Sequence, residues 1–302
     1  MSKPRLVFAG ACNVDFTFRA QRLPAPGETL PGESFHFDFG GKGANQSVAA
    51  ARLGADVALI SRVGDDDFGR RVLAQLANER IGAKFVTETP GFQTGAAAIL
   101  LDAAGNNAII GIPGACAAVT AADVRTAESV IRTASVVVST LEIPGDAVAT
   151  MFHLARQAGA ITILNPAPVF SLPNEVLGLV DYWIPNEVEL GMICGSPARE
   201  LGEIESLGRK CLQRGPKNVI VTLGDRGAMY IREDETSLIP AERVSAVDST
   251  GAGDTFIGCF ATCLAIGFDP IAAIAHANRA AGVTVTRMGA QGALPYRTEL
   301  GW

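Results

Sequence analysis

One glycine-rich stretch, Asp248-Ser-Thr-Gly-Ala-Gly-Asp254, contains the residues best suited to catalysis. An apolar run at helical spacing, Phe256 to Ala265, follows it, so the stretch is predicted to open a helix. The first N–H groups of a helix have no partners within the helix and lie at the positive end of its dipole. The stretch therefore predicts an anion site with a carboxylate, Asp254, inside it.

A carboxylate in that position could take a proton from a hydroxyl group that attacks phosphorus. The N–H groups around Gly251, Ala252 and Gly253 would then hold the charge of the transferring phosphoryl group. The alternative is an ordinary helix start, in which Asp254 only interacts favourably with the dipole.

The second motif is Gly40-Gly-Lys-Gly-Ala-Asn-Gln46. It is not a P-loop, because His36 and Gly43 stand where that pattern requires Gly and Ser or Thr. Its glycines would let the backbone approach a ligand closely, and Lys42 and Asn45 could donate hydrogen bonds at a helix start. The alternative, a tight strand-to-helix turn, requires only one glycine.

Polar residues also follow predicted strands elsewhere in the chain. Asn13 and Asp15 come after the first strand at alternate positions, so both are expected on one face. Ligands bind at strand ends in open α/β folds, and these groups with Lys42 and Asn45 suit sugar hydroxyls. Alone, Asn13 and Asp15 would be ordinary turn residues. Glu142 also follows a strand and either joins this set or is a solvated loop charge.

Two further motifs have equally open interpretations. Asn186 and Glu189 could orient water around Mg²⁺, or form a helix N-cap with its capping-box acid. The turn Thr222-Leu-Gly-Asp-Arg-Gly227 could line a nucleotide, or merely connect two strands.

Composition excludes several classes of protein. The chain has 302 residues, 48% of them hydrophobic, 33 glycines and a net charge of −6, so a well-buried α/β core is expected and a nucleic-acid partner is not. The N-terminal apolar run is too short for most signal peptides, and no stretch approaches about 20 apolar residues, so we expect a cytoplasmic protein without a membrane segment. The six scattered cysteines form no C-x-x-C pair, and with three histidines no zinc site is expected.

The elements that must position these residues alternate between strand and helix from residue 121 onward, which predicts one α/β domain over 1–302 with a mostly parallel sheet covered by helices on both faces. The β-only segments at about 16–39 and 94–112 are predicted to pair as a small sheet that acts as a lid. Strands are expected at 5–10, 34–39, 56–61, 94–101, 107–112, 135–139, 161–164, 180–184, 218–222, 228–231 and 237–239. Helices are expected at 44–53, 66–79, 121–132, 146–158, 199–213, 253–265 and 270–284.

Taken in order, the motifs closely resemble the ribokinase branch of the ribokinase-like (PfkB) carbohydrate kinases over essentially the whole chain. The resemblance rests on Asn13-Val-Asp15, Gly40-Gly-Lys-Gly-Ala-Asn45, Asn165-Pro-Ala-Pro168, Pro185-Asn-Glu-Val-Glu189, Thr222-Leu-Gly-Asp-Arg-Gly227 and Asp248-Ser-Thr-Gly-Ala-Gly-Asp254.

This resemblance implies a three-layer αβα fold with a lid, and an ATP-dependent, Mg²⁺-requiring transfer to the terminal 5-hydroxyl of a sugar, ribose first. Asp254 would be the base and Gly251–Gly253 the anion hole. The lid would close over the sugar and pair with a second subunit. The sugar would contact Asn13, Asp15, Gly41, Lys42, Asn45 and Glu142. The nucleotide or its metal would contact Asn186, Thr222, Gly224, Gly227 and Asn278, with Glu189 acting on Mg²⁺ through water.

Two positions depart from the family pattern. A K⁺ site is implied at Asp248, Thr250, Thr284, Arg287 and Gly289, but Ala293 replaces a commonly found serine, so a weaker K⁺ response is expected. Cys116 replaces a usual asparagine near the sugar and lacks the paired donor and acceptor of an amide, which leaves deoxyribose, a ketohexose or a nucleoside open as acceptor. A non-catalytic binding protein would be expected to lose the base or the anion hole, and both are present.

Overall fold

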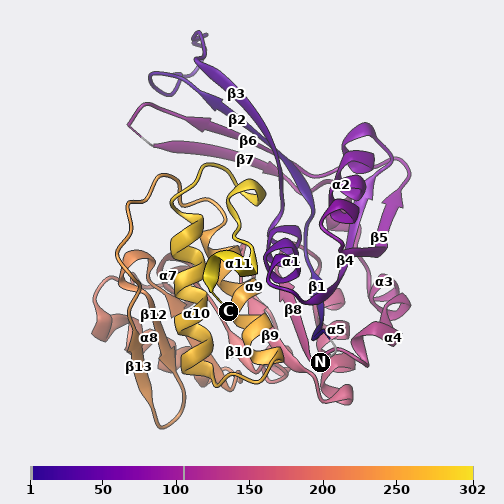
Figure 1. The fold of residues 1–302 in the computed structure, drawn as a ribbon, viewed down its shortest axis with the longest axis vertical. Helices are drawn as coiled ribbons and strands as arrows, with labels where there is room; N and C mark the ends of the chain where they lie inside the picture. The colour runs from indigo at the N-terminus through magenta and orange to yellow at the C-terminus, as the bar shows by residue number, and fades with distance from the viewer. Residues whose placement is uncertain (1–2, 105, 302) are drawn as a thin grey trace.

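The computed structural model describes residues 3–104 and 106–301, and in these residues nine strands form one large sheet (Figure 1). The sheet order is β13-β12-β11-β10-β9-β8-β1-β4-β5. Neighbours from β5 to β11 pair in parallel, while β12 and β13 are antiparallel. The bounds are β1 Arg5–Ala9, β4 Asp56–Gly64, β5 Gly82–Thr89, β8 Val136–Thr140, β9 Ile161–Asn165, β10 Tyr182–Trp183, β11 Asn218–Thr222, β12 Ala228–Ile231 and β13 Thr236–Ile239.

Helices cover both faces of this sheet. In β1, Leu6 and Phe8 belong to one hydrophobic core, and Val7 and Ala9 belong to another, because alternate side chains point to opposite faces. The first core is covered by α1 (Lys42–Arg52), α2 (Asp67–Asn78), α9 (Ala252–Ala265), α10 (Pro270–Thr284) and α11 (Arg297–Leu300). The second is covered by α3 (Ala121–Thr126), α4 (Glu128–Ile131), α5 (Gly145–Ala158), α6 (Asn174–Leu177), α7 (Glu187–Cys194) and α8 (Leu201–Leu212). The predicted three-layer fold is confirmed.

A separate small sheet projects from the top of the view in Figure 1. Its strand order is β3-β2-β6-β7, with β2 and β6 parallel and the other neighbours antiparallel. The strands are β2 Asn13–Arg19, β3 Ser34–Gly40, β6 Ala96–Leu101 and β7 Asn107–Ile112. The first of the two predicted β segments therefore begins at Asn13, so the small sheet starts four residues after β1 ends.

Several elements differ from the expected ranges. Strand β5 was not predicted, because at this edge of the sheet its buried residues, among them Phe85 and Val86, do not alternate. The predicted helix 121–132 is divided at Ala127, where φ is −92° and ψ is 5°. For α7 only the possible N-cap at Asn186 was expected and no helix range, since exposed Val188 and Met192 obscure its buried face.

The glycines before α1 pack against the protein itself. Gly41 has a φ of 86°, and a Cβ added there would lie 2.5 Å from the carbonyl oxygen of Ala11. A Cβ on Gly43 would lie 2.6 Å from the backbone of Gly10. The expected close approach of this backbone is thus made to the chain that follows β1, and the interpretation that one glycine suffices for a structural turn is wrong.

Candidate active site

Asp254 lies in the first turn of α9 and is held by two side-chain amides. Its Oδ2 accepts a hydrogen bond from Asn45 Nδ2 at 3.0 Å, and its Oδ1 accepts one from Gln46 Nε2 at 3.1 Å. The residue is only 8% exposed. Because each oxygen has its own donor, the carboxylate plane is fixed, while hydrogen-bonding capacity remains on each oxygen.

The start of α9 offers uncapped N–H groups beside this carboxylate. The N-cap is Gly251, with a φ of 77°, and no side chain caps the helix. A Cβ added to Gly253 would meet no atom within 4 Å, so this turn borders open space. Together with the helix dipole, this arrangement is suited to an anion next to Asp254.

A chain of buried amides extends from Asp254 in two directions. Gln46 Nε2 also lies 3.2 Å from Asn165 Oδ1, and Asn165 in turn donates to the carbonyl oxygen of Ile184 at 3.0 Å. On the other side, Gln291 Nε2 donates to Asn45 Oδ1 at 3.2 Å. The motifs had not pointed to Gln46, Asn165 or Gln291 as site residues. Gln46 and Asn165 could have been found from their motifs, whereas Gln291 has no local signal.

A polar pocket of about 190 Å³ opens beside Asp254, at the edge where the parallel strands β9, β10 and β11 end. Such edges are the usual ligand sites of open α/β sheets. Residues from five segments line the pocket: Lys42, Asn165, Ile184, Asn186, Glu189, Thr222, Ser249, Gly251, Gly253, Asp254 and Ile257.

Lys42 is the cationic side chain lining this pocket. The negative charge of Asp254 raises the pKa of Lys42, with smaller contributions from Glu142 and Glu189. The ammonium group is therefore held charged among carboxylates. A bound anion such as phosphate, at the uncapped N-terminus of α9, would be one more negative group near the ammonium of Lys42.

The carboxylate of Glu142 caps α1. It accepts from the backbone N–H groups of Ala11, Lys42 and Gly43 at 2.9, 3.0 and 3.1 Å. Burial raises its pKa, partly opposed by these hydrogen bonds. Glu142 thus joins the end of β1 to the glycine motif. It is therefore not the solvated loop charge that was one of the two expectations from the sequence.

Asn13 and Asp15 lie on one face at the root of β2. The Oδ1 atom of Asn13 is buried and has no hydrogen-bond partner among the described residues. Burial and the neighbouring charge of Asp38 raise the pKa of Asp15 to about 7. A Cβ at Gly40 would lie 2.1 Å from Asp15 Oδ2, so glycine makes room for this carboxylate. The two residues offer acceptors in need of donors, such as hydroxyl groups.

Asn186 and Glu189 form the capping box and also line the pocket. Asn186 Oδ1 accepts from Glu189 N at 2.8 Å, and Glu189 Oε2 accepts from Asn186 N at 2.9 Å. Burial raises the pKa of Glu189. The capping role and a binding role are therefore compatible, because Oε1 of Glu189 is not used in the capping box.

The other residues expected near a nucleotide divide into two groups. Thr222 lines the pocket, and the turn that follows it has left-handed glycines, Gly224 at a φ of 59° and Gly227 at a φ of 94°. Asn278 is buried and donates to the carbonyl oxygen of Ile239 at 2.9 Å. Its amide therefore fixes the loop after β13 and does not line the pocket.

Hydrogen bonds to Asp248 link the segments in which a monovalent-cation site was expected. Its Oδ1 accepts from Thr250 N and its Oδ2 accepts from Gly289 N, both at 2.9 Å. Thr284 is buried with its hydroxyl 2.8 Å from that of Thr255, and Arg287 pairs with Glu299. Ala293 is fully buried nearby in the turn Gln291–Ala293. Within 3–104 and 106–301, no cluster of three or more His, Cys, Asp or Glu could hold a metal ion.

Cys116 is turned into the core. It is 1% exposed, and its Sγ lies 3.2 Å from the hydroxyl of Ser61. The thiol therefore replaces an amide without presenting a polar group to the pocket of Asp254.

Comparison with known proteins gives consistent results. The profile of the family described as "pfkB family carbohydrate kinase" matches residues 3–297. A ribokinase of Staphylococcus aureus (strain COL) is 37% identical over 298 residues, 98% of each chain. A deoxyribokinase of Salmonella typhi is 34% identical over 287 residues, covering 95% of this chain and 94% of that one.

Among solved structures, an Arabidopsis thaliana ribokinase complexed with ribose and ATP superposes with a TM-score of 0.90 at 29% identity, covering 99% of this chain and 98% of that one. No helix in the described part of the chain is long and apolar enough to cross a membrane.

Proposed function

Because the chain belongs to the pfkB family of carbohydrate kinases, we propose that it transfers the γ-phosphoryl group of ATP to the 5-hydroxyl group of D-ribose. The observation that carries this proposal is the carboxylate of Asp254, fixed by two amides beside an uncapped helix start. The choice of ribose is supported by the ribokinases to which the chain is similar over nearly its whole length.

Asp254 acts as the general base. The amides of Asn45 and Gln46 hold its two oxygens, so the carboxylate does not have to reorient to accept the hydroxyl proton. The N–H groups of the turn Gly251-Ala-Gly253 lie next to it and stabilise the charge on the transferring phosphoryl group. Attacking oxygen and phosphoryl group thus meet at one helix end.

Lys42 and the α7 capping box hold the nucleotide side. The ammonium group of Lys42 neutralises phosphate charge at the base of the pocket, where Asp254 already keeps it protonated. Asn186 and Glu189 would hold Mg²⁺ through water, because Glu189 is a half-buried carboxylate whose charged form a cation would stabilise. When bound, Mg²⁺ supplies charge neutralisation of the phosphates. Thr222 and the glycines Gly224 and Gly227 line the path of the nucleotide.

The sugar is held at the root of the small sheet. Its hydroxyls donate to Asn13 Oδ1 and to the carboxylate of Asp15, two acceptors that the protein leaves available. Gly41 acts on the sugar site indirectly, because it lets the start of α1 pack against Ala11, and Glu142 acts through α1, whose first N–H groups it binds. Binding of sugar here places a terminal hydroxyl toward Asp254.

The small sheet serves as a lid and as the contact with a second copy of the chain. Strand pairing places Asn13 and Asp15 on one face and Phe18, Phe35 and Ile110 on the other. The second face is largely open: these three side chains are 44%, 57% and 70% exposed. A face of this kind favours a homodimer in which the sheets of two subunits cover each other. We also propose a cytoplasmic location, which is compatible with the need for ATP.

Potassium would bind beside the anion hole, at Asp248 and the backbone of Thr250, Thr284, Arg287 and Gly289. The carboxylate of Asp248 already links Thr250 to Gly289, so these segments are held together without an ion. A cation there would tune the charge next to Gly251.

A second candidate, deoxyribose, is favoured by the deoxyribokinase among the relatives. Cys116 is consistent with it, because the buried thiol offers the sugar no amide. Deoxyribose lacks one hydroxyl, so it would use fewer of the acceptors at Asn13 and Asp15.

The test is ADP release with ATP, Mg²⁺ and a panel of ribose, deoxyribose, ketohexoses and nucleosides. We expect the highest kcat/KM with ribose, and Asp254→Asn should lower kcat by about 10²- to 10⁴-fold with little change in the sugar dissociation constant. If no acceptor gives turnover above that of Asp254→Asn, the protein is a binding protein and the kinase proposal is wrong. A much higher kcat/KM for deoxyribose would replace ribose as the substrate.

A further inference from the structure

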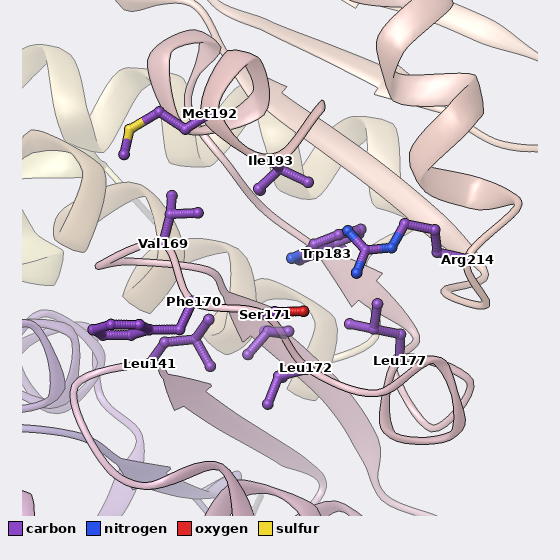
Figure 2. A pocket seen from close by; sticks show the side chains of 11 residues that line it. Leu141, Val169, Phe170, Ser171, Leu172, Leu177, Trp183, Met192, Ile193 and Arg214 are labelled. Carbon is purple, nitrogen blue, oxygen red and sulfur yellow. The ribbon is translucent and has the colours of Figure 1, made fainter. Parts of the chain in front are cut away.

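A second cavity, of about 160 Å³, lies outside the pocket of Asp254, between the segment after β9, strand β10 and helix α7 (Figure 2). Most of its wall is apolar, including Leu141, Val169, Phe170, Met192 and Ile193. A cavity of roughly 150 Å³ with such a lining accommodates one benzene-sized ring. Its size and surface therefore suit a small aromatic group.

One polar atom in this wall has no partner. Trp183 is 3% exposed, and its buried Nε1 makes no hydrogen bond within the described chain. A buried indole N–H normally has an acceptor, and leaving it without one is costly. Figure 2 shows this nitrogen directed into the space between Val169, Ser171 and Ile193. The cavity therefore lacks a hydrogen-bond acceptor at a defined point.

A cation also borders the cavity. The guanidinium group of Arg214 lies 5.4 Å from the centroid of the Trp183 ring, and no ion pair joins it to a carboxylate in residues 3–104 and 106–301. The hydroxyl of Ser171 lines the same cavity. A cation–π contact leaves the positive charge of Arg214 available for an anion.

The walls of the cavity continue directly into the pocket of Asp254. Leu141 precedes Glu142, and its N–H donates to the carbonyl oxygen of Ala167 at 3.1 Å. Val169 follows the segment that begins at Asn165, and α7 begins with the capping box of Asn186 and Glu189. An occupant of the cavity would restrain all three segments at once.

We propose that this cavity binds a small planar aromatic carboxylate that acts as an effector of the enzyme. The ring rests among Val169, Phe170 and Ile193, and the carboxylate accepts from Trp183 Nε1 and pairs with Arg214. The ligand restrains the segments that carry Glu142, Asn165 and Glu189, which changes the Michaelis constant of a substrate. The proposed binding site does not depend on the kinase activity, whereas the proposed effector role rests on the kinase function proposed above.

Binding is tested with benzoate and the full chain. In a Trp302→Phe background Trp183 is the remaining tryptophan of two, so its fluorescence reports on the cavity. We expect a saturable change with a dissociation constant on the order of 1 mM or lower. Benzyl alcohol, which keeps the ring and lacks the charge, and acetate, which keeps the charge and lacks the ring, should each bind at least about tenfold more weakly.

Variants distinguish this site from non-specific binding. Arg214→Gln should weaken benzoate binding by about tenfold or more, whereas Arg132→Gln, at an exposed arginine directly after α4, should leave it unchanged. Calorimetry with Trp183→Phe, which retains an aromatic ring without the N–H group, should also show weaker binding. No saturable signal, or equal affinity in Arg214→Gln and the parent protein, would overturn the site.

The effector role is tested by steady-state kinetics with and without saturating benzoate. We expect the Michaelis constant of ATP or sugar to change by about fivefold. Binding without a change in either constant would overturn the effector role. Absence of turnover in benzoate-free protein would instead count against the kinase proposal, so the two failures are distinguishable.

Discussion

Three buried or half-buried carboxylates surround the proposed sugar site, and each has a different environment. Asp254 receives two side-chain amides, and Glu142 receives three backbone N–H groups. Asp15 lies beside Asp38 and Glu142, whose charges add to the effect of burial and raise its pKa to about 7. At the scale of single residues, this raised pKa makes Asp15 a group that changes its charge near neutral pH.

We predict that the Michaelis constant for the sugar rises as the pH falls from about 8 to about 6, because protonated Asp15 loses an acceptor for sugar hydroxyls. The profile of KM against pH, measured with saturating ATP, tests this. Asp15→Asn should have a high KM at every pH. A wild-type profile that is flat across this range would contradict the assignment of Asp15.

Asp15→Asn should also change stability in a pH-dependent way. The pKa of Asp15 is about 7 in the folded protein and 3.8 ordinarily, so the folded protein binds this proton more tightly. The stabilisation is full below pH 4 and is lost as the pH rises through 7. Removing the carboxylate should therefore raise the free energy of unfolding by about 2 kcal/mol at pH 8 and have little effect at pH 4. Urea denaturation at the two pH values measures this.

Ala293 gives a third prediction at this scale. It is fully buried and has no hydroxyl to offer a cation beside Asp248. Activation by KCl, titrated against a choline salt at constant ionic strength, should be weak, and Ala293→Ser should increase it by about threefold or more. Strong activation of the unmodified protein would show that a serine hydroxyl is dispensable.

At the scale of elements, the strand ends and helix starts could be predicted from sequence far better than their contacts. The glycine motif was correctly placed at the start of a helix, and Asn186 was correctly offered as an N-cap. Alternation of apolar residues could not reveal β5, and no local pattern could place Gln291 beside Asn45. Contacts between residues 246 positions apart depend on the packing of the whole chain.

Glu142 provides the test of how one side chain supports an element. It caps α1 across 100 residues of sequence, so Glu142→Gln places an amide N–H₂ opposite backbone donors. We predict a loss of about 2 kcal/mol in the free energy of unfolding. Chemical denaturation measures it, with Glu175→Gln at an exposed position of α6 as control. Equal stability of the two variants would mean that the cap contributes nothing.

At the scale of the whole molecule, the two sheets present different surfaces. The large sheet presents strand ends to the pocket, and the small sheet extends away from it with an open apolar face (Figure 1). The alternating residues in 34–39 correctly indicated a half-exposed strand. The lid role and the pairing with a second subunit, which the family resemblance implies, stay predictions. Its exposed Ile110 belongs to β7, which has no buried residue.

We predict that Ile110→Glu shifts the protein from dimer toward monomer, because it places a charge in the apolar face. Sedimentation velocity across a range of protein concentrations measures the shift. Ile271→Glu, at a 41% exposed position of α10, is the control and should not change the sedimentation coefficient. A wild-type protein that is monomeric at every concentration would refute the dimer.

Strand β2 carries Asn13 and Asp15 at its root and Phe18 near its far end. The proposed sugar contacts and the proposed subunit contact therefore share one strand of seven residues. Insertion of a single residue would turn every later side chain to the opposite face. An insertion or deletion in this strand would therefore disturb the proposed sugar contacts and the proposed subunit contact together, whereas a substitution at one position can change either contact alone.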